Sequence, residues 1–289
     1  MNWIALRITP DSNRDGVIAA LFEAGSQGVQ EDGASVVTHF PHDAQIETIR
    51  NAVMTVDPRA DIAISAAPET DYSEWRASVG VHRLGGMVIA PPWLAGDLDP
   101  RTTIVIDPAM AFGTGEHPTT RGVIRLMQGI SLPETTGTHI TARRRPVVGP
   151  GDIVADLGAG SAVLSIAAAK LGAARIAAIE IDHDSIGNAE ENVRVNGVSD
   201  RVDVIEGDAE VLLPLLAPVR IVLANIVSSV LIPLLPVMRN SLDSNGRAIL
   251  AGILCEERAM MLAAIDADGW KVGREDTEGA WWSVQIALP

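Results

Sequence analysis

Hydrophobic and polar residues alternate with two different periods over the first 67 residues of the chain. The segments 3–8, 29–40 and 61–66 have the period of strands, and the second of them contains an Asp-Gly turn. The segments 15–24 and 44–56 have apolar residues at helical spacing. The order strand, helix, strand, strand, helix, strand predicts a ferredoxin-like α+β domain over residues 1–67.

A strict alternation of apolar strands and amphipathic helices begins at Gly151 and predicts a doubly wound, Rossmann-like α/β sheet with an antiparallel edge. We therefore expect a linker over 68–97, containing a helix at 72–79 and a short hairpin, and a large domain over 98–289. Residues 131–150 lack apolar periodicity and indicate a loop. The strands expected in the large domain are 98–108, 152–157, 175–181, 202–206, 219–224, 246–252, 270–275 and 281–287.

Composition narrows the class of protein. A hydrophobic content of 47% over 289 residues suffices for packed cores, and no signal peptide or membrane span is recognisable, so we expect a soluble, cytoplasmic monomer. The single cysteine, Cys255, has no partner for a disulfide and no spacing typical of a metal site. A net charge of −15 disfavours direct nucleic-acid binding and favours lysine-rich partners. The run Arg143 to Arg145 is the basic exception, and we interpret it as a solvated loop or an anchoring patch for RNA or an acidic surface.

The segment Asp156-Leu-Gly-Ala-Gly-Ser-Ala162 lies between an apolar strand and an apolar helix, and a second strand ends in Glu180. Gly158 and Gly160 allow a tight turn and close approach of a ligand, and a carboxylate about 20 residues after such a turn can bind a ribose diol. A dinucleotide fingerprint needs a third glycine where this chain has Val163, so NAD is the weaker candidate. The pattern favours S-adenosylmethionine, with a bland turn or another nucleoside ligand as alternatives.

A second glycine-rich loop precedes this turn and ends at Pro118, a residue suited to the first position of a helix. With the loop Ala111-Phe-Gly-Thr-Gly-Glu-His-Pro-Thr-Thr120, the chain resembles the ribosomal protein methyltransferase family that modifies the large-subunit stalk protein L-eleven. The resemblance extends over nearly the whole length. It includes a tryptophan in the first strand, Trp75, Pro92-Trp93, the Asp156 turn with its helix, and Asn225-Ile.

This resemblance implies methyl transfer from S-adenosylmethionine to lysine side chains and the N-terminal amine of that stalk protein, with the N-terminal domain holding the target. It places Thr120, Gly158, Glu180 and Asn225 around the cofactor. Glu180 stands where the family usually has Asp, and Ala159 and Ala162 depart from its usual glycine turn. The alternatives are a methyltransferase for another protein or small-molecule amine, and a docking protein that binds the cofactor without catalysis.

Individual residues have competing interpretations. Asn225 follows an apolar strand, where its carbonyl could accept a hydrogen bond from the attacking amine or satisfy strand-end backbone groups. Asp208 could accept from the adenine amino group or cap a helix. His117 is a candidate general base or a helix-start residue. Of Trp281 and Trp282, which alternate along a terminal strand, at most one should lie in the core while the other could border the substrate cleft.

Overall fold

The protein is described here from a computed structural model that covers residues 3–26, 29–41, 44–66, 80–107, 115–130 and 146–289. The chain divides into two compact units, Met1–Ser78 and Val79–Pro289. Among the helices described, none combines the length and apolar character that a membrane span requires. The predicted helix at 72–79 lies outside the described residues.

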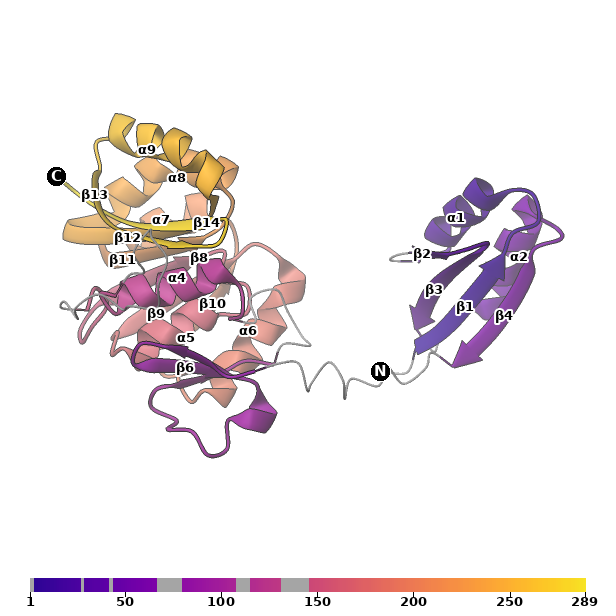
Figure 1. Cartoon of the computed structure of the whole chain (residues 1–289), viewed down its shortest axis with the longest axis horizontal. Helices are drawn as coiled ribbons and strands as arrows, with labels where there is room; N and C mark the ends of the chain where they lie inside the picture. The colour runs from indigo at the N-terminus through magenta and orange to yellow at the C-terminus, as the bar shows by residue number, and fades with distance from the viewer. Residues whose placement is uncertain (1–2, 27–28, 42–43, 67–79, 108–114, 131–145) are drawn as a thin grey trace. The chain divides into compact units, whose positions relative to one another are not determined.

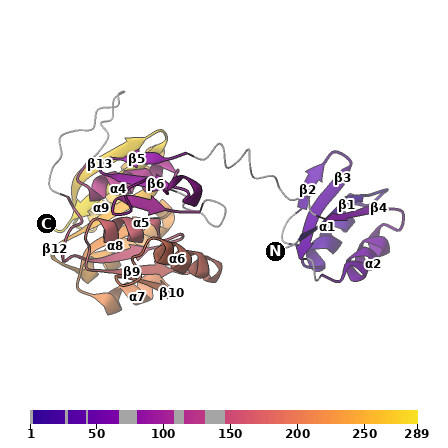
Figure 2. The ribbon, with the colours of Figure 1, turned by 90° about the horizontal axis from the view of Figure 1, so that it is seen from below.

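The first unit has four antiparallel strands in the order β2-β3-β1-β4, with helices α1 and α2 packed on one apolar face (Figures 1 and 2). Leu6 and Ile8 of β1 and Val17 and Leu21 of α1 are buried in that core. The carboxylate of Asp57 accepts hydrogen bonds from the backbone N–H groups of residues 11 to 13, which joins the end of α2 to the start of α1. The elements are β1 (Trp3–Thr9), α1 (Arg14–Glu23), β2 (Val29–Asp32), β3 (Ser35–Pro41), α2 (Ile46–Val56) and β4 (Asp61–Ala66).

The second unit contains a seven-stranded sheet in the order β10-β9-β8-β11-β12-β14-β13, whose first five strands are parallel and whose last two are antiparallel additions. This arrangement confirms the predicted α/β class and its antiparallel edge. The strands are β8 (Ile153–Leu157), β9 (Arg175–Glu180), β10 (Val202–Glu206), β11 (Val219–Asn225), β12 (Leu242–Leu254), β13 (Lys271–Glu278) and β14 (Trp281–Ala287).

Helices cover both faces of this sheet (Figure 1). One apolar core joins the sheet to α4 (Pro118–Met127), α5 (Val163–Lys170) and α6 (His183–Val195). A second core on the opposite face joins it to α7 (Ala209–Leu216), α8 (Ser228–Ser241) and α9 (Arg258–Ala267). Because both faces are covered, the central strands are apolar on both sides, as their near-continuous hydrophobic sequences predict.

The second unit also includes part of the expected linker. The strands β5 (His82–Leu84) and β6 (Met87–Ala90) form an antiparallel hairpin, and β6 pairs in parallel with β7 (Thr103–Val105). Leu84, Met87 and Ile89 are buried in the core that contains α4 and α5. The strand expected over 98–108 is thus shorter, because residues 99–102 form a turn in which the N–H groups of Thr102 and Thr103 donate to the Asp99 carbonyl at 3.1 and 3.0 Å.

Candidate functional site

The glycine turn after β8 is held against the end of the neighbouring strand. Gly158 and Gly160 have φ angles of +67° and +52°, in the left-handed region that glycine adopts without strain. The N–H of Gly158 donates to the carbonyl of Ile179 at 2.9 Å, and the N–H of Gly160 donates to Glu180 Oε2 at 2.7 Å. The turn and the acid at the end of β9 therefore form one hydrogen-bonded unit at the carboxyl edge of the sheet.

Glu180 is 8% exposed, and both of its carboxylate oxygens have a backbone donor. Oε2 accepts from Gly160, and Oε1 accepts from the N–H of Asp182 at 2.9 Å. A carboxylate oxygen can accept two hydrogen bonds. These two contacts fix the orientation of the carboxylate and leave it able to accept from two further donors, which is the number that a ribose diol supplies.

Asp208 lies beside this unit at the end of β10. The N–H of Gly207 donates to the Glu180 carbonyl at 2.8 Å, which brings the two strand ends together. Asp208 is the N-cap residue of α7, and its Oδ1 accepts from the N–H of Glu210 at 2.8 Å. Oδ1 of Asp208 therefore caps α7, as one of the two interpretations of this residue expected. Oδ2 of the exposed side chain is left as a second acceptor.

Asn225 and Thr120 meet at the end of β11. The Asn225 side-chain amide donates to Thr120 Oγ1 at 3.4 Å, although the two residues are 105 positions apart. Thr120 is 1% exposed in the first turn of α4, whereas Asn225 is only partly buried. In the part of the chain that the structure describes, no side chain donates to Asn225 Oδ1, so this oxygen can accept a hydrogen bond from a ligand.

His117 forms the start of α4. Its Nδ1 accepts from the Thr119 N–H at 3.4 Å and lies 2.8 Å from Thr119 Oγ1, so Nδ1 carries no proton and the neutral ring has its proton on Nε2. Burial and then the charge of Arg121 lower the pKa of His117. The ring packs edge to face on Trp281 with centroids 4.7 Å apart. This geometry supports the helix-start role, because Nδ1 is engaged by Thr119 in the first turn of α4.

A buried carboxylate, that of Asp156, lies at the start of the turn. Asp156 is 1% exposed, and Ser165 Oγ donates to its Oδ2 at 2.7 Å. Burial raises the pKa of Asp156 to about 6 against the hydrogen bonds from Ser165, and the charge of Glu180 adds to the rise. Oδ1 of Asp156 is buried and accepts no hydrogen bond from the described residues. The site therefore holds an acceptor that a donor from a ligand or a water molecule could satisfy.

Sequence reasoning missed three residues of this edge. Asn192 is buried in α6 and donates to the Ser161 carbonyl at 3.0 Å, which supports the glycine turn from the helix side. Ile181 directly follows Glu180 at the end of β9 and is 70% exposed, and Val227 is the second residue after Asn225 at the end of β11 and is 58% exposed. An apolar residue one or two positions after the end of a buried strand is the signal that could have identified the last two.

Part of the second glycine-rich loop, residues 108–114, lies outside the described residues. Gly115 is described, with a φ of +82°, and a Cβ there would lie 2.6 Å from Cδ1 of Ile89.

Trp282 is fully buried and Trp281 is partly exposed, so the two tryptophans divide between core and surface as their alternation predicts.

Comparison with known proteins shows the family. The family described as ribosomal protein L11 methyltransferase (PrmA) matches residues 2–288. A ribosomal protein L11 methyltransferase of Myxococcus xanthus is 31% identical over 264 residues, covering 91% of this chain and 84% of the relative, and that of Thermus thermophilus is 30% identical over 267 residues, covering 92% of each. The crystal structure of a ribosomal protein L11 methylase from Lactobacillus delbrueckii subsp. bulgaricus is 26% identical, with a TM-score of 0.59 over 73% of this chain and 99% of that chain. The chain belongs to the ribosomal protein L11 methyltransferase family.

Proposed function

We propose that this protein transfers methyl groups from S-adenosylmethionine to lysine side-chain amines and the N-terminal amine of ribosomal protein L11. Membership of the family supports the reaction and the target. The observation that carries the proposal is the meeting of Thr120, the glycine turn, Glu180 and Asn225 at one edge of the sheet, since open α/β sheets bind their ligands at the carboxyl ends of the strands.

The hydrogen-bond acceptors and the glycine backbone at this edge fit a nucleoside cofactor with an amino-acid end. Glu180 has acceptor capacity for two ribose hydroxyls, and Asp208 has a second oxygen for the adenine amino group. Ile181 offers an exposed apolar surface for the adenine ring next to Glu180. The turn at Gly158 and Gly160 brings backbone rather than side chains toward the ligand.

The bound cofactor would supply an activated methyl group on a sulfonium, so the protein has mainly to align the amine with it. Asn225 Oδ1 would accept an N–H of the amine and direct the nitrogen lone pair at the methyl carbon. The cofactor would supply the methyl group and keep the electron pair of the broken carbon–sulfur bond on its sulfur, while the amine, held by Asn225, would release one proton to solvent. Thr120 holds the Asn225 amide through the hydrogen bond at 3.4 Å.

The amine must be neutral before it attacks. A free lysine has a pKa of about 10.4, so nearly all of it is protonated at neutral pH. Because His117 Nδ1 accepts from the Thr119 N–H at the start of α4, we assign His117 a helix-capping role rather than removal of this proton. We infer that the amine loses its proton on desolvation at the site, which predicts a methylation rate that rises with pH over the neutral and mildly alkaline range.

We assign recognition of the target to the N-terminal domain and the methyl transfer to the second unit. The first unit has no cluster of reactive side chains at the ends of its described strands, whereas the net charge of −15 of the whole chain favours a lysine-rich protein as partner. Deletion of the first unit should therefore weaken methylation of L11 while S-adenosylmethionine still binds.

The proposal is tested by incubating the purified full-length protein with recombinant L11 and S-adenosylmethionine and measuring the intact mass of L11. We expect the mass to increase by whole methyl groups, with one S-adenosylhomocysteine formed for each. Calorimetric titration with S-adenosylmethionine separates the two ways of failing. Binding without methylation of L11 would refute the target, and absence of binding would refute the cofactor and the class of reaction.

A further inference from the structure

A short segment, Ile226 and Val227, leads from Asn225 at the end of β11 into α8. Asn225 pairs with Ala251 of β12 in parallel register, and the N–H of Ile226 donates to the Ala251 carbonyl at 3.1 Å. The backbone of this segment is thereby joined to the end of β12. The position of the Asn225 side chain therefore depends on the geometry of the neighbouring strand.

Gly252 allows β12 to approach this segment closely. The pairing of β12 with β14 shifts register between Leu250 and Ile253, so Gly252 belongs to a β-bulge, and its φ of +83° lies in the left-handed region. A Cβ at Gly252 would lie 2.6 Å from the carbonyl oxygen and 3.0 Å from the nitrogen of Ile226. These are backbone atoms, which cannot rotate away, so a side chain at this position would displace the segment after Asn225.

The side chain of Ile226 connects the same segment to the glycine turn. A Cβ at Gly158 would lie 2.6 Å from Cγ2 of Ile226, so the isoleucine packs directly against the bare backbone of the turn. Ile226 also packs against the apolar core that contains α7, α8 and α9. A shift of the segment would therefore change the distance between Asn225 and the turn that we propose for the cofactor.

The carboxylate of Glu257 fixes the other end of the segment. Glu257 ends the short helix η2 (Cys255–Glu257), which follows β12. Its Oε1 accepts from Ser228 Oγ at 2.6 Å, and its Oε2 accepts from the Leu254 N–H at 3.0 Å. The hydrogen bond from Ser228 and then that from Leu254 lower the pKa of Glu257, so the group is ionised at neutral pH. Ser228 is 4% exposed and is the first residue of α8, so one carboxylate ties the start of this helix to the end of β12.

The start of α8 depends on this contact because its N-cap residue is Val227, which makes no side-chain cap hydrogen bond. Valine has no oxygen that could accept from the first backbone N–H groups of the helix. The positive end of the helix dipole favours a carboxylate nearby. Glu257 supplies that negative charge from a position 29 residues after Ser228.

We propose that Glu257 is a positioning residue for methyl transfer, which holds Ser228 and thereby fixes the segment that carries Asn225. The inference rests on the role proposed for Asn225 in orienting the amine. Glu257 acts through Asn225, because its own oxygens are engaged by Ser228 and Leu254. Loss of this support lowers the rate of the chemical step more than cofactor binding, since attack on the methyl carbon is sensitive to displacements of about 1 Å.

The test compares Glu257→Ala, Glu257→Gln and the control Glu256→Ala in the full-length protein, with S-adenosylmethionine and recombinant L11. We expect Glu257→Ala to lower kcat roughly tenfold and to change the calorimetric Kd of S-adenosylmethionine less than about threefold. Glu257→Gln should restore most of the rate, because an amide can accept from the Leu254 N–H and donate to the Ser228 hydroxyl. Glu256 is the exposed neighbour in the same turn, so Glu256→Ala should leave kcat unchanged.

A double-variant cycle separates positioning from a general loss of structure. In the Asn225→Ala background, Glu257→Ala should lower kcat by less than about twofold, since the side chain that it positions is already absent. A residue that only stabilises the fold would lower kcat by the same factor in both backgrounds, and that result would overturn the proposal. Thermal unfolding verifies that each variant is folded. If Glu257→Ala does not fold, Ser228→Ala removes the same hydrogen bond with a smaller change and takes its place in the cycle.

A readout without L11 distinguishes failure of this proposal from failure of the proposed function. The side-chain amide signals of Asn225 in a nitrogen–proton NMR spectrum are identified by their absence from Asn225→Ala. Glu257→Ala should shift these signals, and Glu256→Ala should leave them in place. If the parent does not methylate L11 and the signals shift, the proposed function fails while the positioning of Asn225 by Glu257 stands. Signals that stay in place in Glu257→Ala overturn the positioning whether or not the parent methylates L11.

Discussion

The buried ion pair between Arg125 and Asp276 should be among the largest single contributions to the stability of the second unit. Arg125 is 6% exposed in α4 and Asp276 is 2% exposed in β13. The guanidinium donates to both oxygens of Asp276, at 2.9 and 2.5 Å, and to Glu278 at 2.8 Å. The pair joins α4, which carries Thr120 and has His117 as its N-cap, to the antiparallel edge of the sheet.

The substitution Arg125→Met removes the charge and keeps most of the apolar stem. It takes the two-pronged guanidinium contact away from the buried carboxylate of Asp276, and removal of one member of a buried ion pair costs about 3 to 5 kcal/mol. Burial would raise the pKa of Glu278, but the hydrogen bonds from Arg121 and Arg125 lower it below its usual value. The variant should therefore lose a large share of a total stability that is typically about 5 to 15 kcal/mol.

Urea unfolding followed by tryptophan fluorescence measures this loss. Arg125→Met and Asp276→Asn should each be strongly destabilising, and the double variant should cost less than the sum of the two because the interaction is removed only once. The exposed pair of Arg101 and Asp99 is the matched control, since it also has two-pronged hydrogen bonds but lies in solvent, and Arg101→Met should leave stability almost unchanged. If Arg125→Met costs no more than this control, or if the two single effects simply add, the reasoning is refuted.

Three further substitutions test the site. Asn225→Ala should reduce the initial rate of L11 methylation by roughly a hundredfold through lost alignment, while calorimetry shows S-adenosylmethionine still bound; an unchanged rate would contradict the orienting role. The raised pKa of Asp156 means that the folded state takes up a proton, so this residue's contribution to stability falls as pH rises from about 4 to about 6. The free energy of unfolding of the parent, relative to that of Asp156→Asn, should therefore decrease by roughly 1 kcal/mol between pH 5 and pH 8. If the free energies of parent and variant change with pH in the same way, the raised pKa of Asp156 is contradicted. Ala162→Gly should change the free energy of unfolding by less than about 1 kcal/mol in urea titrations.

Much of the second unit could be predicted because its strands are buried on both faces. The apolar runs before Gly158 and Asn225 give each strand an unambiguous end, and the alternation with helices fixes a parallel sheet. The small sheet β5-β6-β7 could not be predicted in full. Its hairpin is local in sequence, but the parallel pairing of Val88 with Thr103 spans a segment without periodicity, and nothing in either strand alone identifies the partner.

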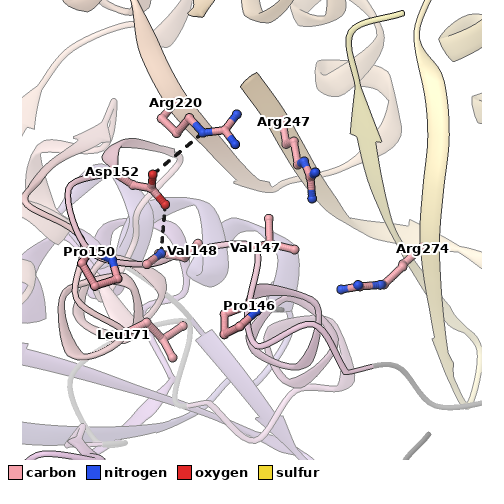
Figure 3. A pocket seen from close by; sticks show the side chains of 10 residues that line it. Pro146, Val147, Val148, Pro150, Asp152, Leu171, Arg220, Arg247 and Arg274 are labelled. Carbon is pink, nitrogen blue, oxygen red and sulfur yellow. Dashed lines mark hydrogen bonds and ion pairs between the residues drawn. The ribbon is translucent and has the colours of Figure 1, made fainter. Parts of the chain in front are cut away.

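The candidate site could be predicted for a topological reason. The carboxyl ends of parallel strands meet at one edge, so residues as distant in sequence as Thr120 and Asn225 come together once the sheet is recognised. The cavity at the amino ends of the strands, lined in part by Arg220, Arg247 and Arg274, follows no such rule (Figure 3). Arg220, Arg247 and Arg274 are ordinary in their local sequence, and they converge only because of strand order and a bulge in β13.

Ala162 illustrates how a departure from a glycine turn can be accommodated. It has a φ of +61° directly before α5, a conformation that costs an L-residue about 1 to 2 kcal/mol relative to its right-handed form. Two terms act in the opposite direction. Alanine restricts the unfolded chain more than glycine does, which contributes about 0.4 to 1 kcal/mol, and its fully buried methyl group contributes about 0.8 kcal/mol. The terms nearly cancel, because the methyl group faces the core shared with α4 and α5 rather than the ligand side of the turn. Alanine at position 162 therefore keeps the same backbone path from Gly158 to α5 that glycine would give. The hydrogen bond from Gly160 to Glu180 is kept with it.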